Sequence, residues 1–286
     1  MSLREANDLI ATRNGFFDQN STIWRVNREM VLLAAGGRAL LMQLAHPKVA
    51  AGVVQHSDFQ ADPFARLHRT MSAMWSIVFD KEPQARESLE RVARVHTRVR
   101  GQVGLGEGVL VGARYDANDQ DLLLWVHATL IDSALAGYDR FVAPLSLAEK
   151  RSYYEDSKQL ARLFGIDERF IPGALDEFEL YMQFMMTGGE IRVGPTGRKL
   201  GRDVLYARPW LFRMFGPLFR FVTAGLLPEK LRTGYGLEWS DSREKLLAAF
   251  LKTVRAGLPL MPNPIRVVPN ARAAERVLRD SRGPEN

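Results

Sequence analysis

The sequence predicts an all-α fold, and three observations support that class. Apolar residues recur with the 3.6-residue period of a helix through most of the chain, and strand-like alternation is nearly absent. Helix-start signals precede several periodic segments, such as Asp62-Pro63 and the SLAE pattern that begins at Ser146. No repeat and no low-complexity linker divides the 286 residues. We therefore expect one multi-helix domain over residues 1–286 that encloses a cofactor pocket.

The segments expected to be helical follow one another closely. Residues 22–45 are largely apolar, and the Gly36-Gly37 pair inside them predicts a kink or a close helix contact. The His46-Pro47 step should interrupt this helix, since the residue before a proline avoids the helical region. Residues 101–112 and 188–201 are glycine-containing and are expected to be loops. Further helices are expected at residues 48–55, 62–79, 83–103, 121–135, 146–163, 172–186, 209–227, 240–256 and 271–280.

Composition excludes several kinds of site. The chain has no cysteine, which excludes disulfides, thiolate-ligated haem and iron–sulfur clusters. It has no HExxH, CxxCH or GxSxG motif, and no glutamate three residues before a histidine as in ferritin-like di-iron proteins. The net charge of +6 is modest. Because no recognisable nucleic-acid-binding motif accompanies the basic residues, we expect no nucleic-acid partner.

The chain shows no membrane-targeting signal. Residues 1–17 are mixed and charged, without the apolar core of a secretory signal. No run of 18 uncharged apolar residues occurs, and the nearest candidate, residues 214–228, is interrupted by Arg220. We therefore expect a soluble cytoplasmic protein.

Two histidines are candidate ligands for a cofactor metal. His96 shares a helical face with Leu89 and Val92, and His127 shares one with Leu123 and Leu130. On such a face a neutral imidazole can bind haem iron through one nitrogen while its other N–H has a backbone or carboxylate partner. The alternative is a core histidine whose nitrogens are satisfied by hydrogen bonds, and periodicity alone favours that alternative.

A polar cluster precedes them on the neighbouring helix. Arg66, Arg69 and Thr70 fall on one stripe at the start of the segment 62–79. Two cations and a hydroxyl on an otherwise apolar face need partners if they are buried. They could bind haem propionates, a substrate carboxylate or dioxygen, or they could lie at the helix edge and pair with Asp58 or Asp62.

Four stretches carry a resemblance to a known family. Together they span about residues 25–255, and their combination is specific. Here the chain resembles the bacterial and fungal family typified by rubber oxygenase (latex clearing protein) and the endoplasmic-reticulum-bound oxygenase of mycophenolic acid biosynthesis. The matching stretches read LLMQLAHPKVAAGVVQHSDFQADPFARLHRT, VARVHTRVRG, YDANDQDLLLWVHATLIDS and LPEKLRTGYGLEW.

The resemblance implies an all-α fold that holds a non-covalent haem b through an axial histidine and oxidises an organic substrate with dioxygen. The family's Arg-x-x-Lys-Thr pocket motif matches Arg66, Arg69 and Thr70, which become the expected catalytic residues. The axial histidine best matches His96, which is then the expected iron ligand. His127 is the reserve assignment, and Arg66 is also expected to contact the cofactor.

Two departures from the family pattern change the expected reaction. Arg69 stands where the family has a lysine that can close the distal site, and an arginine stays protonated and should leave that site more open. Residues 44–65 contain no glutamate to match the family's catalytic one. We therefore expect a small apolar or isoprenoid-like substrate rather than polyisoprene.

A second reading is a non-catalytic haem- or lipid-binding helical protein at a membrane surface. Residues 209–227 interleave aromatic and aliphatic side chains with Arg213 and Arg220, a pattern that suits peripheral membrane contact. The alternative is an amphipathic core helix whose arginines extend to solvent, and it is the favoured one for this stretch.

Overall fold

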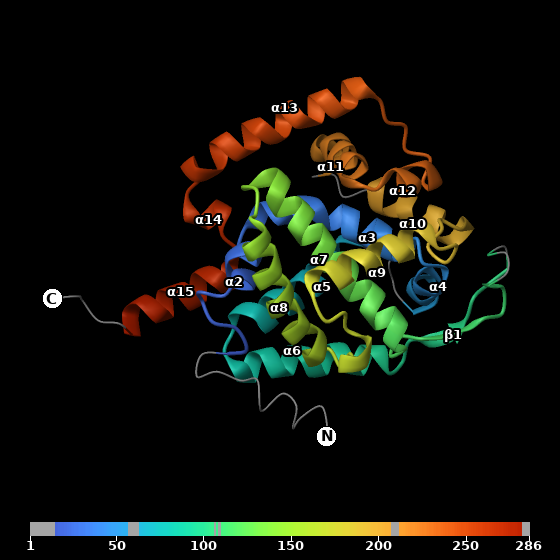
Figure 1. Ribbon diagram of the computed structural model, residues 1–286, viewed down its shortest axis with the longest axis horizontal. Helices are drawn as coiled ribbons and strands as arrows, with labels where there is room; N and C mark the ends of the chain where they lie inside the picture. The colour runs from blue at the N-terminus through green and yellow to red at the C-terminus, as the bar shows by residue number, and fades with distance from the viewer. Residues whose placement is uncertain (1–14, 57–62, 106, 108–109, 207–211, 282–286) are drawn as a thin grey trace.

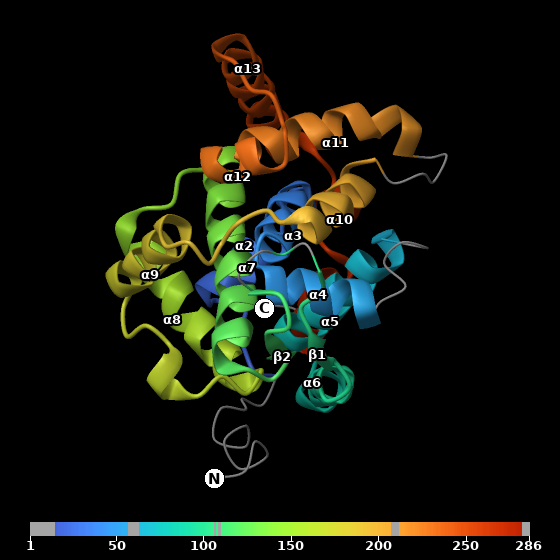
Figure 2. The same cartoon turned by 90° about the vertical axis from the view of Figure 1, so that its right-hand side faces the viewer.

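The computed structural model describes the backbone of residues 15–56, 63–105, 107, 110–206 and 212–281, and the side chains of all of these except 63–68, 212–214 and 281. The predicted all-α class is confirmed, because helices dominate the chain and the described residues form one small two-stranded sheet. Figure 1 shows α7 running through the middle of the molecule, and in Figure 2 α3 lies on one side of α7 and α8 and α9 lie on the other. None of the helices in the described part of the chain is long and apolar enough to cross a membrane.

The α-helices have the following bounds: α2 Thr22–Asn27, α3 Gly36–Leu44, α4 Pro47–His56, α5 Pro63–Phe79, α6 Glu82–His96, α7 Gln120–Phe141, α8 Leu147–Leu163, α9 Leu175–Thr187, α10 Pro195–Leu205, α11 Phe212–Leu226, α12 Glu229–Gly234, α13 Asp241–Gly257, α14 Asn263–Arg266 and α15 Pro269–Ser281. The 3-10 helices are η1 Met30–Ala35, η4 Glu168–Phe170 and η5 Leu258–Leu260. The strands are β1 Arg100–Gln102 and β2 Arg114–Asp116.

Local signals place many of these helices where the sequence predicts them. Ser146 caps α8 through the expected capping box, in which its hydroxyl accepts from the Glu149 N–H and the Glu149 carboxylate accepts from the Ser146 N–H. Pro83 lies in the first turn of α6, and the Ser240 hydroxyl caps α13. Such caps are encoded within a few residues, so the sequence is enough to find them.

The sequence predicts one kinked helix over residues 22–45. The structure instead divides this segment into α2, η1 and α3. Glu29 has extended backbone angles and forms an isolated antiparallel bridge with Val267, and the Val268 N–H donates to the Arg28 carbonyl. This pairing with a segment near the far end of the chain uses backbone groups that a continuous helix would need. The close contact expected at the glycine pair does occur, since a Cβ on Gly37 would lie 2.3 Å from the Thr223 hydroxyl.

Three further expectations are wrong. Residues 101–112 are not simply a loop, because β1 and β2 pair antiparallel with Gly101 opposite Tyr115. α6 ends at His96, since the chain turns there into β1. Residues 188–201 include the start of α10, whose first turn is capped by a distant carboxylate, with the Thr196 N–H donating to Glu107 Oε1 at 2.9 Å.

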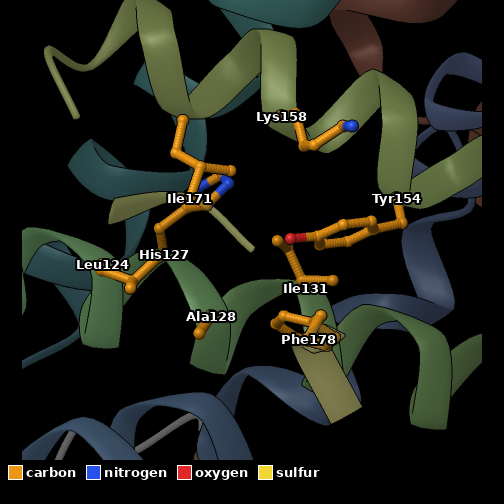
Figure 3. Close-up of a pocket in the computed structure, with 8 residues that line it drawn as sticks. All are labelled: Leu124, His127, Ala128, Ile131, Tyr154, Lys158, Ile171 and Phe178. Atoms are coloured by element: carbon orange, nitrogen blue, oxygen red, sulfur yellow. The ribbon is translucent and has the colours of Figure 1, made fainter. Parts of the chain in front are cut away.

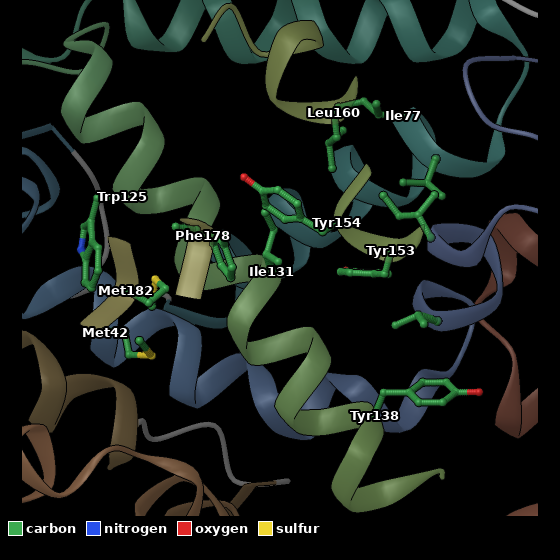
Figure 4. Packing of buried hydrophobic residues seen from close by; sticks show 14 of the residues in the cluster. Met42, Ile77, Trp125, Ile131, Tyr138, Tyr153, Tyr154, Leu160, Phe178 and Met182 are labelled. Carbon is green, nitrogen blue, oxygen red and sulfur yellow. The ribbon is translucent and has the colours of Figure 1, made fainter. Parts of the chain in front are cut away.

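The core gathers around α7, α8 and α9. Trp125 and Ile131 on α7 are buried with Tyr154 on α8 and Phe178 on α9 (Figure 4). Tyr154 and Phe178 pack with ring centroids 5.0 Å apart, a distance at which aromatic pairs attract each other. α5 and α6 close one side of this core, which places Arg69, Thr70 and His96 at its edge, whereas His127 on α7 is buried within it.

Candidate functional site

α5 and α6 form a hairpin whose register is fixed by two serines. Only Asp80 and Lys81 join the helices, and the Ser88 hydroxyl on α6 donates to the Ser76 hydroxyl on α5 at 2.9 Å in the buried interface. His96 lies eight residues after Ser88 on α6, and residue 68 lies eight residues before Ser76 on α5. Because both helices rise by the same amount per residue, His96 lies about as far from this contact along α6 as the turn at residues 66–70 lies along α5, while the two helices diverge from each other (Figure 2).

On the face of α6 that packs against α5, the side chains become more exposed toward the C-terminal end of α6. Ala85 and Leu89 are buried, whereas Val92 and His96 farther along are half-buried. His96 thus ends a stripe that faces α5, where the hairpin begins to open to solvent. The apolar face predicted for His96 is present, but the ring lies at its edge and not in the middle of the core.

The three polar residues of α5 lie at the same end of the hairpin. Arg66 lies in the first turns of α5, and its side chain is outside the described residues. Arg69 and Thr70 have exposed side chains. Arg66, Arg69 and Thr70 thus lie on α5 at the end of the hairpin at which α6 carries His96, and the Arg69 and Thr70 side chains face solvent.

A mainly apolar cavity of about 90 Å³ lies farther along α5. α5 contributes Met71, Met74 and Trp75, and α7 contributes His127 and Ile131. The other described residues that line it come from α2, η1, α3, α7 and α8 and the link at Glu29: Asn27, Glu29, Leu32, Leu33, Ala35, Gly36, Ala39, Leu130, Ser133, Ala134, Tyr153, Ser157 and Leu160. His96, Arg69 and Thr70 are not among the described residues that line this cavity.

His127 is a fully buried, neutral histidine. Its Nε2 lies 2.9 Å from the Ser157 carbonyl oxygen on α8. Burial lowers the pKa of His127 to about 4, more than the hydrogen bond to Ser157 raises it. Since a carbonyl oxygen only accepts, Nε2 carries the proton, and Nδ1 presents a lone pair. Nδ1 is buried and has no hydrogen-bond partner in the described part of the chain.

The ring of His127 also borders a smaller cavity of about 10 Å³, on the side of α8 and α9 (Figure 3). Tyr154, Lys158 and Phe178 are among the residues around it. The polar groups of Tyr154 and Lys158 already have hydrogen-bond partners. The Tyr154 hydroxyl donates to the Pro172 carbonyl, and the Lys158 ammonium donates to the Gly173 carbonyl. This space is at most the size of one water molecule, so the 90 Å³ cavity is the one with room for part of a ligand.

The other polar groups on the wall of the larger cavity are paired. The Glu29 carboxylate is 3% exposed and accepts two hydrogen bonds from the Arg266 guanidinium, at 2.9 and 3.0 Å. The Tyr153 hydroxyl donates to Asn27 Oδ1, and burial raises the pKa of Tyr153. The Ser157 hydroxyl donates to the Tyr153 carbonyl. Among the described residues that line this cavity, His127 carries the buried side-chain acceptor without a hydrogen bond, and that atom, Nδ1, has almost no accessible surface of its own.

Most of the residues that line the larger cavity cannot be identified from the sequence. Glu29 and Arg266 are 237 residues apart, and neither lies in a motif. Met71, Met74 and Trp75 share another face of the segment 62–79, at the i, i+3, i+4 spacing of a helix, and that apolar spacing is the signal the sequence offers for them.

The remaining histidines have structural partners or lie outside the described side chains. His46 is buried, with Nδ1 accepting from the Lys48 N–H and Nε2 3.3 Å from a Glu190 carboxylate oxygen. His56 Nε2 lies 2.9 Å from the Arg100 carbonyl. The side chain of His68 lies outside the described residues. No three histidine, aspartate or glutamate side chains of the described residues form a group that could hold a metal ion.

A family model matches most of the chain. Residues 24–256 match the family described as ER-bound oxygenase mpaB/B′/Rubber oxygenase, catalytic domain. The chain is 26% identical over 239 residues to the uncharacterized protein Rv2237 of Mycobacterium tuberculosis, a match that covers 82% of this chain and 90% of the relative. The same values hold for the uncharacterized protein Mb2261 of Mycobacterium bovis. No solved structure matches the chain.

Proposed function

Because the chain belongs to the family of mpaB-type and rubber oxygenase catalytic domains, we propose that it is a haem b-dependent oxygenase acting with dioxygen on a small apolar or isoprenoid-like substrate. Family membership supports an oxygenase role. The observation that supports the position of the cofactor is the register of the α5–α6 hairpin, in which His96 lies at the same end as Arg66, Arg69 and Thr70.

The residues at the open end of this hairpin fit a haem by their chemistry. Imidazole is the usual axial ligand of haem iron, and arginines pair with carboxylates such as the propionates. His96 is half-buried, and the Arg69 and Thr70 side chains face solvent, so a bound group could cover them. The 90 Å³ cavity is smaller than the roughly 150 Å³ cavities that admit benzene, so it fits part of a substrate and not a macrocycle.

Each residue would then have a distinct role. The haem, when bound, supplies the activation of dioxygen, and the chain supplies its ligand, its orientation and the access of substrate. His96 would hold the iron, and Arg66 would pair with a propionate. An arginine guanidinium does not serve as a nitrogen ligand to iron as a lysine amine can, so Arg69 would contribute positive charge beside Thr70 without binding the iron.

His127 is the second candidate for the ligand. Its neutral state and buried lone pair are those of a metal ligand. However, its Nε2 is held by the Ser157 carbonyl, and Nδ1 is the nitrogen nearer the ring's own backbone, where a macrocycle meets the helix. Ligation through Nε2 of His127 would therefore require the bond to Ser157 to break, and ligation through Nδ1 would bring the macrocycle against the backbone of α7.

An absorption spectrum of the purified protein, oxidised and dithionite-reduced, tests the proposal. We expect a Soret band that shifts on reduction, and its loss or marked shift in His96→Ala but not in His46→Gln, a matched variant of a buried histidine with other partners. A full, unshifted spectrum in His96→Ala together with loss in His127→Ala would transfer the ligand role to His127. Absence of haem after expression with excess haem precursor would refute the cofactor.

Exposed apolar side chains on α11 favour a second candidate function, non-catalytic binding at a membrane surface. Phe215 is 62% exposed and Leu218 is 40% exposed, and Tyr206 before α11 is 57% exposed and lies under the Arg220 guanidinium at 4.6 Å. α11 lies across one edge of the molecule beside α10 (Figure 2), which carries exposed Lys199 and Arg202. Apolar and basic side chains together suit an anionic lipid surface.

Co-sedimentation with anionic vesicles tests this alternative. It predicts binding that Phe215→Ser weakens several-fold and that high salt reduces, in a protein that carries no haem. A haem spectrum with no vesicle binding would exclude it.

A further inference from the structure

We infer that residues 259–265, PLMPNPI, form an anchor loop that inserts into the surface of an anionic lipid bilayer and holds the protein there as a peripheral membrane protein. The anchor loop runs from η5 into α14 and lies at the upper left edge of the molecule in Figure 1, where α13 turns into α14. It lies outside residues 24–256, which match the family model, so the inference does not rest on the proposed function. It also names a surface different from that of α11.

The anchor loop is apolar and exposed along its whole length. Every residue from 259 to 265 is exposed, and none of them is charged. Leu260 is 85% exposed, Ile265 is 61% exposed and Met261 is 42% exposed. Prolines stand between these side chains, and Asn263 is the one polar residue of the loop. Single exposed apolar side chains are common on proteins, but a continuous exposed apolar segment is typical of a contact surface.

The backbone of the anchor loop suits a medium without water. Three of its seven residues are prolines, which have no N–H group. The Met261 N–H donates to the Leu258 carbonyl, and the Ile265 N–H donates to the Pro262 carbonyl. An N–H without a partner is costly in hydrocarbon, so a segment with few free donors enters a bilayer at a lower free-energy cost than an ordinary loop.

The base of the anchor loop is fixed to the rest of the molecule. The Arg266 N–H donates to the Pro262 carbonyl, and the Arg266 guanidinium donates to the buried Glu29 carboxylate at 2.9 and 3.0 Å. The Val268 N–H donates to the Arg28 carbonyl. The apolar side chains are therefore held away from the protein surface before any partner binds, which reduces the entropy lost on binding.

The charge around the anchor loop is basic. Residues 245–274 include five basic residues and no acidic one. Of these, Lys245 and Lys252 are exposed on α13, the helix that leads into the loop. The Asp139 carboxylate on neighbouring α7 is already paired with Lys150 at 2.6 Å. Basic side chains beside an apolar segment are attracted to the negative charge of anionic lipid headgroups.

These features fit a bilayer better than a protein partner. The residues that contribute most to protein–protein binding are enriched in Trp, Tyr and Arg, and residues 259–265 contain none of the three. A protein partner must also match the shape of the protruding loop, whereas lipid adapts to it. A bilayer that contains anionic lipid offers negative charge over its whole surface, as the basic surroundings of the loop require.

Co-sedimentation of the purified protein, with its cofactor content unchanged, tests binding to vesicles of phosphatidylcholine alone and of equal amounts of phosphatidylcholine and phosphatidylglycerol. We expect tighter binding to the mixed vesicles. The double variant Leu260→Ser/Ile265→Ser should bind them about tenfold more weakly or worse, and Lys252→Gln should bind them about fivefold more weakly. All three side chains are exposed, so the variants should keep the fold. The matched control Phe215→Ser, which changes an exposed apolar residue of α11, should bind as the wild type does.

A fluorescent label tests insertion directly. The chain has no cysteine, so a single introduced thiol can carry a polarity-sensitive fluorophore. With the mixed vesicles, the emission of a label on Leu260→Cys should shift to shorter wavelength, and spin-labelled lipids should quench it. The control is Ala93→Cys, an exposed position on α6, which lies at the opposite end of the molecule from α13 in Figures 1 and 2. Its label should show neither change.

Several results would overturn the inference. These are equal vesicle binding by the double variant and the wild type, an unshifted label at position 260, or loss of binding in Phe215→Ser, which would assign the contact to α11. Gel filtration that shows self-association lost in the double variant would also overturn it, because a second copy would then cover the loop. None of these outcomes depends on the Soret band, so the anchor loop and the haem proposal can fail independently.

Discussion

Ser88 donates a hydrogen bond of 2.9 Å to Ser76 across the buried α5–α6 interface. The Ser76 hydroxyl can also donate to the Gln84 carbonyl at 3.4 Å, so this polar contact is tied to the start of α6. In an interface of otherwise apolar side chains, one such contact is a fixed point that opposes sliding of one helix along the other. The position of His96 at the same end of the hairpin as the turn at residues 66–70 follows from it.

Ser88→Ala should lower the free energy of unfolding by about 1 kcal/mol, because Ser76 loses its buried partner. The larger side chain of Ser88→Leu should also separate the helices at this point and weaken retention of haem. Urea denaturation measures the first effect, and the rate of haem transfer to an apo-acceptor protein measures the second. Ser242→Ala on the exposed face of α13 is the control and should change stability by less than about 0.5 kcal/mol. Unchanged haem retention in Ser88→Leu would contradict a role of the register in the site.

Stability should fall as the pH is lowered from about 6.5 toward 4, partly because of His127. Its pKa in the folded chain is lowered to about 4 by burial, while the ordinary value is 6.5. Between these values the unfolded chain binds a proton that the folded chain does not, which favours unfolding by on the order of 3 kcal/mol in total. Below about pH 4 both states are protonated at this residue, and it contributes no further change.

Urea denaturation at pH 7, 5.5 and 4.5 checks this prediction, with His127→Gln as the comparison. The variant should lose less stability than the wild type over this range. His46 also has a pKa lowered by burial and contributes in the same direction in both proteins, so the difference between them isolates His127. If the free energy of unfolding fell equally with pH in both proteins, the His127 ring would not be buried and neutral in the folded chain.

Arg38 should be a strong determinant of stability. It is buried, and its guanidinium lies 2.6 Å from the Asp132 carboxylate and donates to the Ser133 hydroxyl and the Leu226 carbonyl. It thereby joins α3, α7 and the end of α11. Arg38→Met should cost about 3 kcal/mol or more, because it leaves several buried groups without a partner. Arg38→Lys should recover only part of this, since a lysine cannot make the same planar set of contacts.

Arg91 provides the control for Arg38, because it pairs with Glu87 on the surface of α6. Arg91→Met should change the free energy of unfolding by less than about 1 kcal/mol, as is usual for exposed ion pairs. Both variants are measured by urea denaturation at pH 7. A similar loss in the two would contradict a structural role for the buried network.

Two glycine substitutions should have opposite effects. A Cβ on Gly197 in α10 would lie 2.5 Å from the Leu44 carbonyl oxygen at the end of α3, so Gly197→Ala should force the elements apart and cost about 1–3 kcal/mol. Gly257 ends α13 with nothing within 4 Å of the same position. Gly257→Ala should therefore raise stability by about 0.5–1 kcal/mol, because alanine restricts the unfolded chain. Thermal unfolding followed by circular dichroism should show Tm changes of opposite sign, and a lower Tm for Gly257→Ala would contradict this account.

The sequence by itself determined the all-α class and the positions of most helices. Helical periodicity and caps such as Ser146 and Ser240 act within one or two turns, so they can be found without knowledge of the fold. The family resemblance added Arg66, Arg69, Thr70 and His96, residues that periodicity alone did not distinguish from a helix edge and a core histidine. Their roles at a cofactor stay a prediction.

Only the tertiary structure decided which of these residues meet. The break at Glu29 depends on pairing with Val267, and the cap of α10 depends on Glu107, contacts between segments far apart in the chain. The position of His96 relative to the α5 motif depends on one contact between Ser76 and Ser88. The position of the proton on His127 depends on Ser157, which lies on another helix. Such facts arise from packing between distant segments, for which a single sequence carries no periodic signal.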